Sequence, residues 1–138
     1  MLGRRRGPVL FQLPPNFKKD LDRLAELRVR LEDGVKAAGG VIVGDDAPRI
    51  PTIGAVALPG ASNASLLVQF DLAGIAVSAG SACASGAMKG SEVLAAMGVA
   101  PEIAAGTLRI SFGPSTSDTD VDRFLTEWSR IAQRAKAA

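Results

Sequence analysis

A stretch of small residues from Ser78 to Gly90 constrains most strongly how this chain can fold. Ten of its thirteen residues are Gly, Ala or Ser, in the sequence SAGSACASGAMKG. Side chains this small cannot fill a hydrophobic core, and the glycines give the backbone extra freedom. The short run Ile75–Val77 precedes the stretch, and Ser91, a residue type that commonly caps helices, follows it. The sequence therefore predicts a loop over 78–90 between a strand and a helix.

This predicted loop carries Cys83, the only cysteine of the chain. Each arm between Cys83 and a flanking element is about six residues long, so the thiol could be carried up to ~20 Å. A lone thiol on such a tether is typical of a group carrier, although a free cysteine is usually a small buried hydrophobic residue. The chain contains no histidine, which excludes a Cys–His nucleophile pair within it and argues against metal ligation. Two interpretations remain, a thiol activated by a group outside the chain and an inert one.

Composition and charge indicate one globular domain and exclude several classes of partner. The chain has 138 residues, of which 47% are apolar and 22% charged. Its formal charge of +2 becomes −1 when the terminal cluster Arg4–Arg6 is left out, so we expect no nucleic-acid partner. No apolar run approaches the ~20 residues of a membrane span. A single cysteine and the lack of an apolar signal-peptide core before Pro14 lead us to expect a cytoplasmic protein with no membrane partner.

Hydrophobic spacing predicts the order of helices and strands. Apolar residues at steps of three and four, among them Leu24, Leu31 and Val35, predict helices over about 16–38, 62–73 and 117–136, with shorter turns over 91–98 and after Pro101. Ser62 is the expected cap of the second helix. Runs of β-branched residues predict strands over 41–43, 50–58, 75–78 and 107–112. In the shorter 91–98 helix and in the last helix, the residues expected to face the core are Val93, Leu94, Met97, Val121, Phe124, Leu125, Trp128, Ile131, Ala132 and Ala135.

The last predicted strand alternates between apolar and polar residues. Leu108, Ile110 and Phe112 share one face, which we assign to the core. Arg109 lies on the other face, with Thr107 and Ser111, and projects from a rigid strand toward whatever covers that side. An exposed, unengaged arginine is the simpler interpretation of the strand alone. The order of elements predicts an α+β fold, a small, mostly antiparallel sheet of about four strands covered by helices.

Three motifs follow one another along the chain: AVSAGSACASG over 76–86, K-x-S-x-V-L-x-A-M-G over 89–98, and TLRISFG over 107–113. In order and spacing they resemble the C-terminal part of cysteine desulfurases, pyridoxal-phosphate enzymes of the class V aminotransferase group. The resemblance runs from about Leu24 to the C-terminus. It implies the small domain of a fold-type I enzyme, a loop cysteine at Cys83 that accepts sulfur as a persulfide, and an arginine at Arg109 that grips the substrate's α-carboxylate.

The chain departs from that family in what it lacks. Family members are much longer, and their large N-terminal domain carries the cofactor-binding lysine and a histidine that stacks on the cofactor. The lysines of this chain lie at Lys18, Lys19, Lys36, Lys89 and Lys136, and none has a neighbouring histidine. The resemblance thus implies pyridoxal phosphate as cofactor, while its lysine is absent from this chain. We expect the chain not to be competent alone.

The first residues have a different character from the rest. The segment over 7–20 resembles part of the DUF72 proteins, a barrel-fold family of unknown function. We therefore predict an N-terminal extension of different origin over 1–17 and a desulfurase-like small domain over 18–138.

Two functions from different classes follow. By resemblance, the chain takes part in sulfur transfer from L-cysteine to a sulfur-acceptor protein, as in iron–sulfur cluster assembly, with a large-domain chain as partner or as a homo-oligomer. The alternative is a non-catalytic α+β binding or dimerisation module, or an inactive gene remnant. The mean hydropathy of +0.20 leads us to expect surface made for contact, and hence self-association or binding to a large-domain partner.

Overall fold

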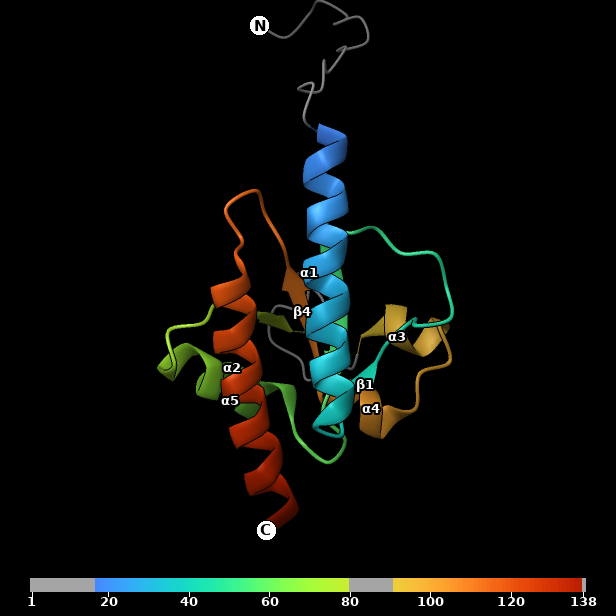
Figure 1. The fold of residues 1–138 in the computed structure, drawn as a ribbon. Coiled ribbons are helices and arrows are strands. Elements are labelled where there is room, and N and C mark those ends of the chain that lie inside the picture. The colour runs from blue at the N-terminus through green and yellow to red at the C-terminus, as the bar shows by residue number, and fades with distance from the viewer. Residues whose placement is uncertain (1–16, 80–90, 138) are drawn as a thin grey trace, which may run out of the picture.

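Two long helices lie side by side across one face of an antiparallel sheet in the computed structural model, which describes residues 17–79 and 91–137 (Figure 1). These helices are α1 (Phe17–Ala37) and α5 (Asp118–Ala137), and the shorter ones are α2 (Asn63–Leu72), α3 (Glu92–Ala96) and α4 (Pro101–Ala105). The strands are β1 (Val41–Ile42), β2 (Ile53–Ala57), β3 (Ser78–Ala79) and β4 (Thr107–Ser111), in the spatial order β1-β2-β4-β3. Every neighbouring pair is antiparallel. The predicted α+β class is confirmed.

The core lies between the sheet and the two long helices, and its position follows from the helical spacing. Trp128 is fully buried and forms a cluster with Phe124 and Phe70, in which the centroid of the Phe124 ring is 5.8 Å from that of Trp128 and 4.8 Å from that of Phe70. The assignment of the tryptophan to the core is therefore confirmed. The other buried apolar side chains of α1 and α5 are Leu24, Leu27, Leu31, Val35, Val121, Ile131 and Ala132.

Helix ends fall where the capping residues predict them. The Ser62 hydroxyl accepts a hydrogen bond from the backbone N–H of Ser65 at the start of α2, and Gly74 follows that helix with φ of 69°. Before α5, the Ser117 hydroxyl accepts from the Asp120 N–H, and the Asp120 carboxylate accepts from the Ser117 N–H. Pro101 occupies the first position of α4.

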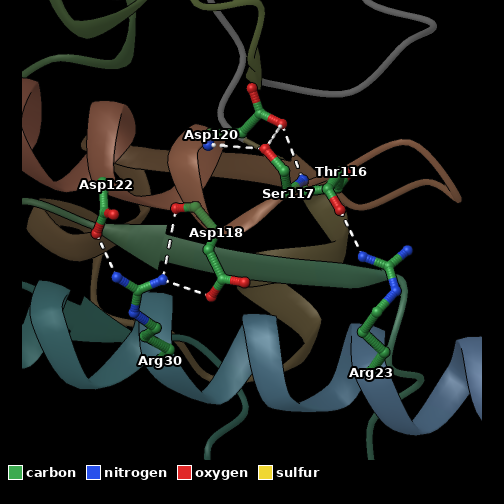
Figure 2. A network of polar contacts seen from close by, with 7 residues as sticks. All are labelled: Arg23, Arg30, Thr116, Ser117, Asp118, Asp120 and Asp122. Carbon is green, nitrogen blue, oxygen red and sulfur yellow. Dashed lines mark hydrogen bonds and ion pairs between the residues drawn. The ribbon is translucent and has the colours of Figure 1, made fainter.

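Polar contacts attach the start of α5 to α1 (Figure 2). Arg30 of α1 pairs with Asp118 at 2.7 Å and also with Asp122. About two turns nearer the N-terminus of α1, Arg23 donates to the carbonyl oxygens of Thr116 and Pro114, at 2.6 and 2.8 Å. The segment between β4 and α5 is thereby held against α1.

Several predicted bounds were wrong, each for a local reason. The second strand begins at Ile53 rather than at 50, because Pro51 and Thr52 lie in a turn. The third strand covers 78–79 rather than 75–78, because the Ile75 N–H donates to the Phe70 carbonyl at the end of α2. Ala79 therefore belongs to a strand instead of the predicted loop, whereas Ser78, which the predicted strand and the predicted loop shared, belongs to the strand. The remaining loop residues, 80–90 with Cys83, lie outside the described residues, as do residues 1–16.

Some predictions of side-chain orientation were also wrong. Val93 of α3 and Met97, which caps the C-terminal end of that helix, are exposed. Ala135, in the last turn of α5, is exposed as well. Thr107, expected on the open polar face, is buried because its hydroxyl donates to the Ile103 carbonyl of α4 at 2.8 Å. Within 17–79 and 91–137, no helix is both long and apolar enough to cross a membrane.

Candidate functional site

The sheet has one face that the long helices cover and one that they leave open. Leu108 and Ile110 of β4 point into the core, while Arg109 and Ser111 point away from it and are exposed. This alternation confirms the predicted orientation of the strand, and it places Arg109 on the outer face.

Arg109 lies between two small residues of the neighbouring strands. Ala55 of β2 is its register partner on one side, and Ser78 of β3 is its register partner on the other. All three side chains share the outer face, because directly paired residues of antiparallel strands point to the same side of a sheet. A methyl and a hydroxymethyl group leave the guanidinium unobstructed on both sides.

The outer face is closed at one end and open at the other. At the closed end α4 covers Thr107, and the adjacent Ala57 is fully buried. At the open end Ser111 pairs with Ile53, whose side chain is 38% exposed. Arg109 lies at the boundary between the part of the outer face that α4 covers and the part that is open.

The charge of Arg109 has no acidic partner within the described part of the chain. Arg30 and Arg49, in contrast, pair with carboxylates, and Arg49 makes a two-pronged contact with the buried Glu32 at 2.5 and 3.1 Å. A guanidinium held on a strand with no acid beside it presents parallel N–H donors, whose geometry matches a carboxylate or a phosphate. The site can therefore bind an anionic group from outside the described residues.

The neighbouring strand leads directly into the segment that contains Cys83. β3 ends at Ala79, one residue after the partner of Arg109, and Cys83 follows four residues later in the sequence. The structure thus brings the stem of the predicted cysteine loop next to Arg109. The two predicted site residues cannot be compared directly, since Cys83 lies outside the described residues.

The residues around Arg109 do not fit a pyridoxal-phosphate site by themselves, since the cofactor is held through a lysine Schiff base. Lys36 pairs with Asp45 at 2.6 Å, and this contact raises the pKa of the lysine and lowers that of the carboxyl group. Lys136, near the end of α5, donates to the Ala38 carbonyl. Both lysines belong to the helices on the opposite face. Among the described residues there is also no cluster of three or more side chains suited to a metal ion.

Sequence reasoning missed the role of Ser78 as the partner of Arg109. It placed Ser78 both at the end of the third strand and at the beginning of the loop, and it gave the residue no partner across the sheet. Only the register of β3 against β4 reveals the pairing, and register between strands thirty residues apart leaves no local signal.

Comparison with known proteins gives consistent results at the levels of family, sequence and structure. The aminotransferase class-V family model matches residues 15–124. The chain is 40% identical over 105 residues to the cysteine desulfurase of Gluconacetobacter diazotrophicus, covering 75% of this chain and 26% of that protein. It is 34% identical over 120 residues to cysteine desulfurase IscS 1 of Archaeoglobus fulgidus, covering 86% of this chain and 31% of that protein.

A solved structure shows the same arrangement of elements. The NifS-like protein from Rickettsia africae superposes with a TM-score of 0.73 at 27% identity, covering 86% of this chain and 30% of that one. The chain therefore spans between a quarter and a third of the length of the relatives it matches.

Proposed function

The chain belongs to the aminotransferase class-V family, and from this premise we propose that it supplies the sulfur-accepting part of a cysteine desulfurase. In this proposal Arg109 binds the α-carboxylate of L-cysteine. Cys83 accepts the substrate's sulfur, so that an S–S bond forms on Cys83 as the C–S bond of L-cysteine breaks, and the carbon fragment keeps the electron pair, takes up a proton and leaves as alanine. The resulting persulfide passes its outer sulfur to an acceptor protein.

The observation that carries the proposal is the position of Arg109 on the outer face, where none of the described residues pairs an acid with it. A buried or paired arginine would have to break existing contacts before it could bind a substrate. Arg109 has small neighbours on both sides, Ala55 and Ser78, and an open end of the sheet next to it. These features favour a single carboxylate ligand that docks from above the sheet.

The length of chain between β3 and Cys83 also supports the proposal. Four residues span at most ~14 Å, so the Cα of Cys83 cannot lie farther than that from the Cα of Ala79, and the thiol extends only one short side chain beyond it. The side chain of Arg109 projects from the strand next to Ala79. Both groups can therefore reach one substrate molecule.

A second unit has to complete the site, because the described residues around Arg109 include no lysine that could hold the cofactor. We propose that a pyridoxal-phosphate-binding domain, in the same polypeptide or in another, packs on the outer face. Ile53, an exposed apolar side chain on the outer face of β2, supports such a contact.

A chimera tests this function. Residues 18–138 would replace the matching C-terminal part of the Gluconacetobacter diazotrophicus cysteine desulfurase, which shares 40% identity with the chain. With dithiothreitol present to reduce the persulfide, we expect the purified chimera to bind pyridoxal phosphate and to release sulfide and alanine from L-cysteine. A chimera that folds and takes up the cofactor but makes neither product would favour the alternative, a non-catalytic binding module.

Variants of the chimera separate substrate binding from folding. Arg109→Ala removes a charged pair of hydrogen bonds, so we expect kcat/KM for L-cysteine to fall by about 10- to 100-fold, equivalent to ~1.5–3 kcal/mol. Arg134→Ala is the matched control, since Arg134 is an exposed arginine near the end of α5. An equal loss of activity in both variants would argue against a specific role for Arg109.

A further inference from the structure

A pocket of about 220 Å³ lies between the segment 74–77 and the end of β4, beneath the edge of the sheet. It belongs to the core side of the sheet, whereas Arg109 belongs to the outer face. Apolar side chains of the sheet and of α1 and α5 form most of its lining, and polar residues line the rest. The lining residues used below are Ile75, Ala76, Val77, Ser111, Phe112 and Arg123.

The hydrogen-bonding pattern of β4 determines which backbone groups face this pocket. The Phe112 N–H donates to the Thr52 carbonyl at 2.8 Å, so residue 112 points its backbone groups toward β2. In an antiparallel ladder these directions alternate along the strand. The N–H and C=O groups of Ser111 therefore point away from β2, toward the side of β3.

On that side the ladder stops before it reaches Ser111. β3 pairs with β4 only at Ser78–Arg109 and Ala79–Leu108. Continuing the same register would pair Ala76 with Ser111, yet no backbone hydrogen bond joins these two residues in the structure. One residue earlier in the chain, the Ile75 N–H already donates a hydrogen bond to the Phe70 carbonyl. Ala76 and Ser111 thus both line the pocket, with an incomplete sheet edge between them.

We propose that this pocket binds the end of an extended peptide with aliphatic side chains, which adds to the edge of β4 at Ser111. Backbone groups of the peptide would pair with the N–H and C=O of Ser111, as in recognition by β-strand addition. An aliphatic side chain of the peptide would pack against Ile75, Val77 and Phe112. The pocket is small and ends where β3 and β4 join, so it accommodates a peptide end rather than a long strand. This proposal does not depend on the function assigned to Arg109 and Cys83.

Two charged residues line the pocket, Asp120 and Arg123, and each already makes hydrogen bonds elsewhere. Arg123 donates to the Ala73 carbonyl at 3.3 Å, and the Asp120 carboxylate accepts from the N–H and the hydroxyl of Ser117. A neutral peptide with blocked ends can therefore enter without displacing an ion pair.

Titration of the full chain with a blocked tripeptide, acetyl-Val-Ala-Val-amide, tests the proposal by nitrogen-15 NMR. We expect saturable shifts of the amide signals of Ala76, Ser111 and Thr116, and slower hydrogen exchange at Ser111 when the peptide is bound. Acetyl-Gly-Gly-Gly-amide, which has the same backbone and no side chains, is expected to bind much more weakly. Shifts that are absent, or that occur only on the outer face around Arg109, would overturn the proposal.

Two variants and one measurement on the free chain complete the test. Val77→Phe fills the pocket and is expected to abolish the shifts, whereas Leu72→Ala, at an exposed position outside the lining, is expected to leave them unchanged. If Val77→Phe does not fold, hydrogen exchange in the unmodified chain still decides. Strong protection of both Ala76 and Ser111 without peptide would mean that the two residues already pair with each other, and would contradict the proposal.

Discussion

Ser78 lies directly opposite Arg109 in the β3–β4 ladder. This pairing connects the two parts of the molecule to which we assign chemistry. Arg109 occupies a rigid strand inside the sheet, while Ser78 is the penultimate residue of the strand that leads to Cys83. The segment that contains Cys83 therefore starts beside Arg109 because of the strand pairing alone. The small residues after Ala79 are not needed to bring it there.

The two faces of β4 predict opposite effects of mutation at adjacent positions. Arg109→Ala should change the free energy of unfolding by no more than ~0.5 kcal/mol, because its side chain is exposed. Leu108→Ala should lower it by ~2–5 kcal/mol, because Leu108 is fully buried and its truncation leaves a cavity. Urea unfolding of the two variants measures both values. A large loss for Arg109→Ala with a small one for Leu108→Ala would mean that the faces are inverted.

Gly106, just before β4, has no room for a side chain. A Cβ atom there would lie 2.3 Å from the backbone carbonyl oxygen of Leu58, which itself accepts from the Ala61 N–H. Because backbone cannot move aside as a flexible side chain can, we expect Gly106→Ala to destabilise the fold by at least ~1–3 kcal/mol.

Gly113→Ala is the matched control for that substitution. A Cβ at Gly113 would meet nothing within 4 Å among the described residues, and its φ is not positive. Thermal unfolding should therefore show a lower Tm for Gly106→Ala and little change for Gly113→Ala. Similar Tm values for the two variants would contradict the packing described here.

The start of α5 should lose stability at acidic pH. Hydrogen bonds from the hydroxyl and the backbone N–H of Ser117 hold the pKa of the Asp120 carboxyl below its ordinary value of 3.8. A carboxyl group with a lowered pKa stabilises the fold at pH values above 3.8, and this contribution disappears as the pH falls through the lower, folded-state pKa.

The free energy of unfolding, measured from about pH 6 to about pH 2 so that the range includes the carboxyl pKa, tests the predicted loss of stability in acid. Ser117→Ala removes one of the hydrogen bonds, so the variant should lose less stability on acidification than the unmodified chain. Identical pH profiles for both proteins would show that the Ser117–Asp120 contact does not contribute.

Much of the fold could be predicted from the sequence because its signals are local. The stripe from Leu24 to Val35, the cap at Ser62 and the alternation around Arg109 each depend on residues a few positions apart, and all three were confirmed. The buried carboxylate of Glu32 was not predicted. Its partner Arg49 lies 17 residues away, in a segment whose path is set by tertiary contacts.

The same limit applies to the candidate site. Arg109 could be predicted as a site residue because the alternation of apolar and polar residues along β4 shows which face of the sheet its side chain lies on. Its neighbours Ala55 and Ser78 come from strands that are far away in the sequence, so their positions depend on register. The incomplete ladder at Ala76 could not be predicted either. The run of Ile75 to Val77 is typical of a strand, yet the hydrogen bond of Ile75 to the end of α2 takes precedence.

Cys83 should react quickly in the native chain, because the residues around it in the sequence are too small to bury a thiol. As the chain has a single cysteine, the rate of alkylation by iodoacetamide reports on that site alone. We expect similar rates in buffer and in denaturant. A thiol that is alkylated only after denaturation would indicate a buried, structural cysteine.

The central claim is that Cys83 accepts sulfur from L-cysteine with the help of Arg109. Mass spectrometry of the chimera after a single addition of L-cysteine tests it most directly. We predict that the peptide containing Cys83 gains the mass of one sulfur atom, that a thiol reductant removes the gain, and that Arg109→Ala greatly reduces it while Arg134→Ala does not. An unmodified Cys83 peptide in a chimera that holds pyridoxal phosphate and consumes L-cysteine would contradict the claim.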